Sequence, residues 1–140
     1  DKAIEVCGLP KRKCVTKKFR IHGYRKNPDL TDHMYVYGSD EPKILRLIEQ
    51  EPALGEKLSQ KFGYTLAEVV WAGREEMAIT LEDVLARRVR MLFVDAREAM
   101  AAAPKAAAIM ARELGRDQAW IDEQVKSFTD LAKNYIFEQK

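Results

Sequence analysis

Three arginines in the middle of the chain carry the side chains best suited to binding an anion. Arg87, Arg88 and Arg90 lie within one short segment, and guanidinium groups bind phosphate or carboxylate through paired hydrogen bonds. Asp83 precedes Arg87 by four residues, which is the usual spacing of an ion pair on one helix face. We expect these arginines to form salt bridges within the fold or to a neighbouring domain, and direct contact with a phosphate ester is the alternative.

Two pairs of adjacent acidic residues could provide acid–base catalysis only if their carboxylates converged. Glu75 is followed by Glu76, and Glu82 is followed by Asp83. Neighbouring side chains on a helix point about 100° apart, so a shared site for two carboxylates is not expected. We predict that these groups face solvent or pair with nearby arginines, and we assign no catalytic residue.

Histidine and cysteine are too sparse to predict a metal site or a catalytic nucleophile. The two histidines are His22 and His33, and the two cysteines are Cys7 and Cys14. A structural or catalytic metal site needs about three or four convergent ligands, and nothing else in the sequence clusters with these residues. The histidines are predicted to be structural or solvated, and the cysteines to be reduced thiols in a cytosolic compartment.

The glycines are spread too widely to form a phosphate-binding loop. Gly55 and Gly63 are the closest pair and lie eight positions apart, whereas nucleotide-binding loops place their glycines about two to five positions apart. The chain is therefore not expected to bind a dinucleotide cofactor by itself.

The charge is distributed unevenly over a chain of 140 residues, a length typical of one domain. Residues 1–33 hold nine Lys and Arg against four Asp and Glu, whereas the remainder holds 15 against 18. The basic segment can be a solvated connector or a strip that faces another domain, which is the interpretation that we favour. The alternative is a surface for nucleic acid or an anionic membrane.

The elements that would position these residues differ between the two parts of the chain. Residues 1–40 are predicted to be a connector arm: a frayed helix end over 1–10, then an extended segment over 14–24 in which Val15, Phe19 and Ile21 alternate with polar residues. Tyr35 and Tyr37, and later Trp71, are expected to pack into the core or against a neighbouring domain. Residues 41–140 are predicted to form the helical domain.

Helix-capping residues and apolar periodicity divide residues 41–140 into helices. Ser39 or Asp40, Thr80 with Asp83, and Asp117 are candidate N-caps. Pro104 is expected to stop one helix and open the next at its first position. The predicted fold is an all-α, compact bundle of roughly five to six helices preceded by an extended N-terminal arm. The expected helices begin at about residue 41 and cover 52–63, 66–77, 81–103, 104–114 and 118–135.

Three blocks of sequence, in order, resemble the C-terminal helical domain of FAD-dependent glycerol-3-phosphate dehydrogenases and the related α-glycerophosphate oxidases. The resemblance covers about residues 7 to 135. The blocks are Cys14-Val15-Thr16 with Ile21-His22-Gly23-Tyr24; Val69-Val70-Trp71 through Thr80-Leu81-Glu82-Asp83 and Arg87-Arg88 to Ala103-Pro104-Lys105; and Met110-Ala111-Arg112-Glu113-Leu114-Gly115 with Trp120, Gln124 and Phe128.

The resemblance implies a non-catalytic domain of a larger flavoprotein. The complete enzyme would bind FAD in an N-terminal domain that is missing here, and would oxidise glycerol 3-phosphate to dihydroxyacetone phosphate with quinone or oxygen as electron acceptor. This chain would bind no FAD, and its first residue, Asp1 rather than Met, predicts an excised fragment. The expected location is the cytoplasm, with peripheral attachment to the inner membrane face. No D-x-[DN]-x-[DN]-G loop is present, so calcium regulation is not predicted.

A free-standing interaction module is the competing hypothesis. It would use the basic residues 11–26 to bind nucleic acid or anionic lipid, and its binding would weaken steeply with salt because counterions are released from phosphates. The hypothesis of a domain from a larger flavoprotein predicts no nucleic-acid partner.

Overall fold

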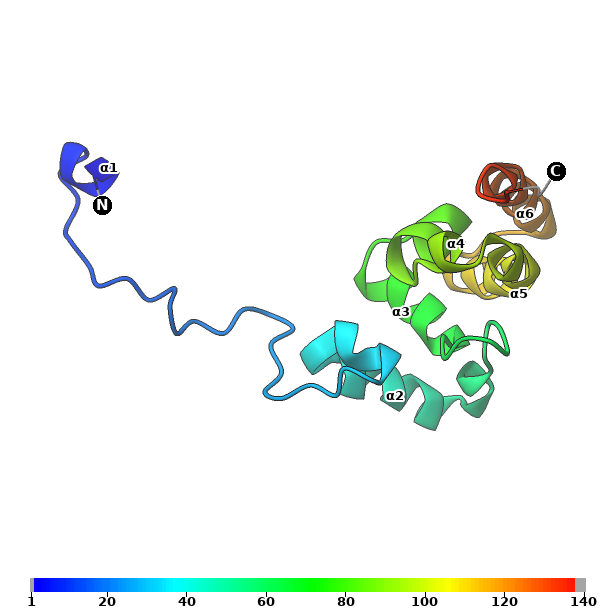
Figure 1. Cartoon of the computed structure of the whole chain (residues 1–140), viewed down its shortest axis with the longest axis horizontal. Helices are drawn as coiled ribbons and strands as arrows, with labels where there is room; N and C mark the ends of the chain where they lie inside the picture. The colour runs from blue at the N-terminus through cyan, green and yellow to red at the C-terminus, as the bar shows by residue number, and fades with distance from the viewer. Residues whose placement is uncertain (1, 138–140) are drawn as a thin grey trace.

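The computed structural model describes residues 2–137, and over that range the backbone forms helices and no strand. This confirms the predicted all-α fold. Figure 1 shows a helical body joined to an extended N-terminal arm, with the short helix α1 (Lys2–Val6) at the far end of the arm.

Two long helices at the C-terminal end make the most extensive helix–helix contact of the fold. They are α5 (Ala96–Leu114) and α6 (Gln118–Lys133). α5 packs closely because its buried face consists almost entirely of alanine, and small side chains let two helix backbones approach each other. The buried residues of this face are Ala96, Ala99, Ala102, Ala103, Ala106, Ala107, Met110 and Ala111.

Local signals set the ends of these two helices. The Asp95 carboxylate accepts the backbone N–H groups of Arg97 and Glu98, each at 3.1 Å, and so caps the start of α5. Gly115 ends α5 in the left-handed conformation at φ 63°, which glycine adopts without a Cβ clash. The Asp117 carboxylate accepts the Trp120 N–H at 3.0 Å, so the predicted cap of the last helix is confirmed.

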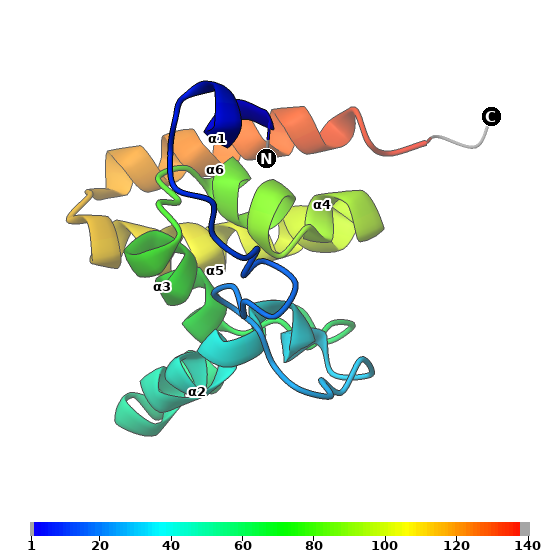
Figure 2. The same ribbon diagram turned by 90° about the vertical axis from the view of Figure 1, so that its left-hand side faces the viewer.

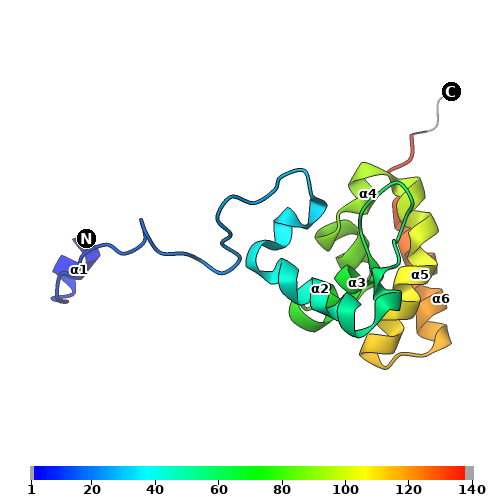
Figure 3. The ribbon, with the colours of Figure 1, turned by 90° about the horizontal axis from the view of Figure 1, so that it is seen from below.

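The remaining helices stack on the other side of α5. α3 (Leu66–Glu75) packs against α5 on one side and against α2 (Glu41–Gln50) on the other. α2 in turn contacts two short 3₁₀ helices, η1 (His33–Asp40) and η2 (Pro52–Gly55). Figure 2 shows α6, α5 and α2 as successive layers, and Figure 3 shows the arm leaving on the side of α2, opposite α6.

The segment predicted as one helix over residues 81–103 is broken twice, and that prediction was wrong. A π-helical turn, η3 (Asp83–Arg88), is followed by Arg90 in the left-handed conformation at φ 58° and by the one-turn helix α4 (Met91–Val94). The predicted cap is present, because the Thr80 hydroxyl accepts the Asp83 N–H at 3.2 Å and the Asp83 carboxylate accepts the Thr80 N–H at 3.0 Å.

Pro104 neither stops a helix nor opens one, contrary to the prediction, because α5 runs through it. Proline removes one backbone N–H and crowds the carbonyl of the residue four positions earlier, here Met100. Pro104 is exposed and Met100 is half-buried, so water can reach the carbonyl that loses its donor. Buried alanines on both sides of Pro104 hold the two halves of the helix against the core.

Two other predicted elements also differ from the structure. The helix expected over 52–63 is only the four residues of η2, followed by an irregular segment that makes one isolated β-bridge between Lys57 and Thr65. Residues 14–24 include a turn and lack strand pairing, and Val15, Phe19 and Ile21 are exposed. Alternating apolar residues form a strand only when a partner strand accepts their backbone hydrogen bonds, and the described residues contain none.

No helix among those that the structure describes has both the length and the apolar character needed to cross a lipid bilayer.

Replacing Phe128 by alanine should lower the free energy of unfolding by about 3–5 kcal/mol. Phe128 is 2% exposed on the face of α6 that packs into the core, so the change leaves a cavity. Phe137→Ala is the matched control, since that ring is 95% exposed, and it should change stability by less than about 0.5 kcal/mol. Urea unfolding followed by circular dichroism measures both. Equal effects of the two substitutions would contradict this packing of α6.

Candidate functional site

A fully buried carboxylate joins η1 to the start of α3. Glu68 has no exposed surface, and its carboxylate accepts the backbone N–H of Thr65 at 2.7 Å and the Tyr37 hydroxyl at 3.2 Å. Oε2 of Glu68 also lies 3.1 Å from Nε2 of His33. A buried charge is tolerated when its oxygens are hydrogen-bonded on every side, and here the partners come from two elements far apart in sequence.

The same carboxylate changes the titration of its neighbours. Its hydrogen bond raises the pKa of His33, while burial opposes that effect. Burial, and then the charge of Glu68, raise the pKa of Tyr37, which therefore stays protonated and can donate its hydrogen bond. His33 is half-buried and stacks edge-on against Tyr64, with ring centroids 5.3 Å apart. Of the two roles predicted for the histidines, structural or solvated, His33 has the structural one.

Beside this network lies a cleft of about 380 Å³ between η1 and residues 88–94, which we call the η1–α4 cleft. Glu68 and His33 reach one part of it, and the rest of its lining mixes aromatic, aliphatic and basic side chains. The lining includes Tyr35, Val36, Tyr64, Arg90, Phe93 and Val94.

The three arginines singled out from the sequence have different partners. Arg87 pairs with Asp83 at 2.7 Å and with Glu82 at 2.6 Å, which confirms the predicted helix salt bridge. Arg88 donates to the backbone carbonyl of Glu76 at 2.6 Å, and its Nε lies 3.3 Å from the Glu76 carboxylate.

Arg90 is the exception. It lines the η1–α4 cleft, and across residues 2–137 no ion pair involves it. A non-glycine residue in the left-handed conformation costs on the order of 1–2 kcal/mol. The π-helical turn before it, in which the Val89 N–H bonds the Val84 carbonyl five residues back at 3.0 Å, is itself a rare geometry that is frequent at functional sites.

The acidic pairs face solvent or pair with nearby arginines, as predicted, although Glu82 and Asp83 meet at the same guanidinium. Glu82 and Asp83 both pair with Arg87, and Glu76 pairs with Arg88, whereas Glu75 is exposed. Burial raises the pKa of Glu76, and the charge of Arg88 opposes this.

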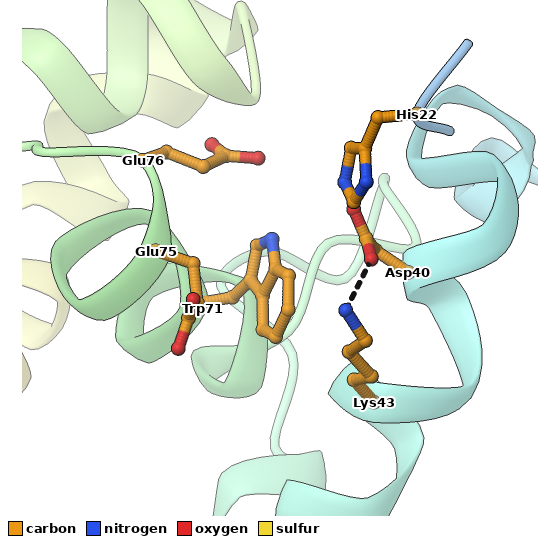
Figure 4. A pocket seen from close by; sticks show the side chains of 6 residues that line it. All are labelled: His22, Asp40, Lys43, Trp71, Glu75 and Glu76. Atoms are coloured by element: carbon orange, nitrogen blue, oxygen red, sulfur yellow. Dashed lines mark hydrogen bonds and ion pairs between the residues drawn. The ribbon is translucent and has the colours of Figure 1, made fainter.

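A second, smaller pocket of about 250 Å³ lies where the arm meets the helices. Figure 4 shows His22, Asp40 and Lys43 on one side of it and Trp71, Glu75 and Glu76 on the other. Asp40 lies 2.6 Å from Nε2 of His22 and 2.8 Å from Nζ of Lys43, and these contacts, that of Lys43 first, lower the pKa of Asp40. Lys43 pairs with Asp40 on one side of this pocket, and Glu75 and Glu76 line the other side.

The arm is attached to the helices at this junction. The Ser39 N–H donates to the Gly23 carbonyl at 3.2 Å, and Arg25 forms an ion pair with Glu41. Gly38 has φ 53°, and a Cβ there would collide with the Gly23 carbonyl, so this close approach requires glycine.

Within residues 2–137, no group of three or more His, Cys, Asp or Glu side chains converges as metal ligands do. The predictions that this chain binds no metal and no FAD, and contributes no catalytic residue, stay predictions. Sequence reasoning missed Glu68, although Thr65-x-x-Glu68 before an apolar run is a capping-box pattern that would have drawn attention to it.

Comparison with known proteins identifies similar sequences. Residues 14–121 match a family described as the C-terminal domain of alpha-glycerophosphate oxidase. A probable mitochondrial glycerol-3-phosphate dehydrogenase of Dictyostelium discoideum is 28% identical over 96% of this chain and 20% of its own length. Glycerol-3-phosphate dehydrogenase 2 of Mycobacterium tuberculosis is 32% identical over 85% of the chain and 20% of its own length.

The mitochondrial glycerol-3-phosphate dehydrogenase of Homo sapiens is 36% identical over 84% of the chain and 16% of its own length. The chain thus spans about a fifth or less of the length of these curated relatives. No solved structure matches it with comparable significance.

Replacing Glu68 by alanine should destabilise the fold by about 3–5 kcal/mol, because the Tyr37 hydroxyl and the Thr65 N–H lose a buried acceptor. Glu75→Ala is the matched control on the same helix, exposed to solvent, and should cost about 0.5 kcal/mol or less. Thermal unfolding measures both. A Glu68 variant as stable as the control would show that the carboxylate does not hold η1 in place.

The stability of the chain should fall as the pH rises through the raised pKa of His33. Because that pKa is higher in the folded state than the ordinary value of 6.5, the protonated ring stabilises the fold. This contribution is fully present below about pH 6.5 and is lost as His33 deprotonates in the folded state. Urea unfolding across pH in the parent and in His33→Gln isolates the effect. A pH dependence unchanged by His33→Gln would contradict the assignment.

Proposed function

This chain belongs to the family of the C-terminal domain of alpha-glycerophosphate oxidase, and we propose that it is the non-catalytic C-terminal helical domain of an FAD-dependent glycerol-3-phosphate dehydrogenase. The observation that carries the proposal is the match over residues 14–121, together with relatives that bear the dehydrogenase name and are about five times longer. The complete enzyme oxidises the 2-hydroxyl of glycerol 3-phosphate to the ketone of dihydroxyacetone phosphate and passes the electrons to quinone or oxygen.

FAD and the reacting atoms belong to the part of the protein outside this chain. The residues present here do not fit a flavin dinucleotide, because the glycines are too far apart for a pyrophosphate-binding loop. The described residues also lack the parallel strands between which such cofactors bind. The carboxylates near the arginines are used in salt bridges, which suits a structural domain rather than a site of proton transfer.

The role that we assign to this domain is to brace the flavin domain. Residues 1–40 connect the two domains, with the end of this connector, η1, packed on α2, and residues 41–140 form the helical domain. Contacts of His22 and Arg25 with the start of α2 support a connector whose end is fixed to the helices. We further propose that the complete enzyme is cytoplasmic and attaches peripherally to the inner membrane face.

The competing hypothesis of a free-standing module that binds nucleic acid or anionic lipid has less support. The relatives described above are all named as glycerol-3-phosphate dehydrogenases. A gel-shift and vesicle-binding series over increasing salt tests this hypothesis directly, since binding through residues 11–26 would weaken steeply.

Purified residues 1–140 should give no flavin spectral shift with FAD, and no reduction of a dye acceptor with glycerol 3-phosphate. The complete polypeptide encoded at the same locus should purify with bound flavin and reduce the dye. The two proteins are compared by absorbance under identical conditions, with glycerol in place of glycerol 3-phosphate as the substrate control. Turnover by residues 1–140 alone, or a complete polypeptide without flavin, would overturn the proposal.

A further inference from the structure

Four large apolar side chains that the fold leaves in solvent lie together around the η1–α4 cleft. Tyr35 is 43% exposed, Val36 65%, Phe93 56% and Val94 63%, and all four line the cleft. Tyr135 near the C-terminal end extends this surface by stacking edge-on against Phe93, with centroids 5.6 Å apart. Exposed apolar side chains that gather around one cleft mark a binding surface.

The charge in the cleft complements an acidic partner. Arg90 stands among the apolar side chains, and no ion pair within residues 2–137 uses it. The one carboxylate in the lining, that of Glu68, is fully buried and already bonded by Tyr37 and Thr65. The cleft therefore offers apolar contacts around one available guanidinium, which suits a protein segment that combines apolar residues with a carboxylate.

The backbone adopts unusual geometry along residues 83–94, which include the α4 side of the η1–α4 cleft. The π-helical turn of η3 and the left-handed Arg90 interrupt what the apolar periodicity predicts as one regular helix. They start α4 in a new direction, and α4 is the element that carries Phe93 and Val94. Strained backbone held in place by its surroundings is typical of functional surfaces.

We propose that the η1–α4 cleft is the surface on which this domain docks against the preceding flavin domain of the same polypeptide. This rests on the proposed function. The family is a C-terminal domain, and the chain spans only 16–21% of its relatives, so most of such a protein precedes it. The arm enters the fold directly at η1, which supplies His33, Tyr35 and Val36 to the cleft. A tethered partner therefore has a high effective concentration at this surface.

The test compares the complete polypeptide with residues 1–140, using cysteine labelling at single sites. Cys7 and Cys14 are replaced by serine in both proteins, and Phe93→Cys reports on the cleft. Ala119→Cys is the control, because it is exposed at the end of α6 opposite Tyr135. Peptide mass spectrometry measures the maleimide labelling rate at each site. The label at position 93 should enter at least about tenfold more slowly in the complete polypeptide, with position 119 unchanged.

Adding Arg90→Glu to the complete polypeptide should restore most of the labelling at position 93, because it sets a like charge against the acidic partner. Arg116→Glu, an exposed arginine next to the control site, should leave the protection intact. Circular dichroism checks that each variant folds.

Equal labelling at position 93 in the two proteins would overturn the proposal. Slower labelling at position 93 of residues 1–140 that appears only with anionic vesicles would also overturn it, because that result assigns the cleft to a membrane. Slower labelling that appears only at high protein concentration would overturn it too, because it assigns the cleft to a second copy of the chain. The proposed function fails separately, if the complete polypeptide holds no flavin.

Discussion

A carboxylate that is fully buried must have its oxygens hydrogen-bonded by the protein. Glu68 meets this condition with partners from two distant segments of the chain. Thr65 lies three residues away on the same helix start, whereas His33 and Tyr37 arrive from η1, more than thirty residues earlier. Because the charge is costly without those partners, η1 must lie against α3. That position in turn fixes one wall of the η1–α4 cleft and the point at which the arm leaves the helices.

The rest of the bundle depends on close packing rather than on polar pairing. The alanine face of α5 brings α6 to one side and α3 to the other, and larger side chains such as Phe128 fill the remaining space. The charges of the helical body are mostly used in surface ion pairs, for example Arg74 with Glu113 at 2.6 Å. Each such pair contributes little stability by itself. The core and the Glu68 network therefore carry the fold.

Arg90 lies at the cleft that we propose as the docking surface, and its position depends on the irregular backbone before it. It follows a π-helical turn, adopts a left-handed conformation and stands beside Phe93, Val94 and Tyr35 at the cleft. Exposed apolar side chains around one available guanidinium have the chemistry of an interface. This agrees with a family whose members are C-terminal parts of much longer proteins.

Local signals in the sequence were enough to determine the helical class, the caps at Thr80 and Asp117, and the salt bridge of Arg87 with Asp83, because each depends on residues within about one helical turn. The resemblance carried by three ordered blocks pointed to the family. The helix through Pro104 could not be read in the same way, because its continuity depends on the alanine face packed against α6 and α3. The burial of Glu68 was likewise decided by tertiary contacts, since its partners His33 and Tyr37 lie on η1, which only the folded chain brings against α3. The break at Arg90 is a feature of the folded backbone that the apolar periodicity of residues 81–103 does not indicate.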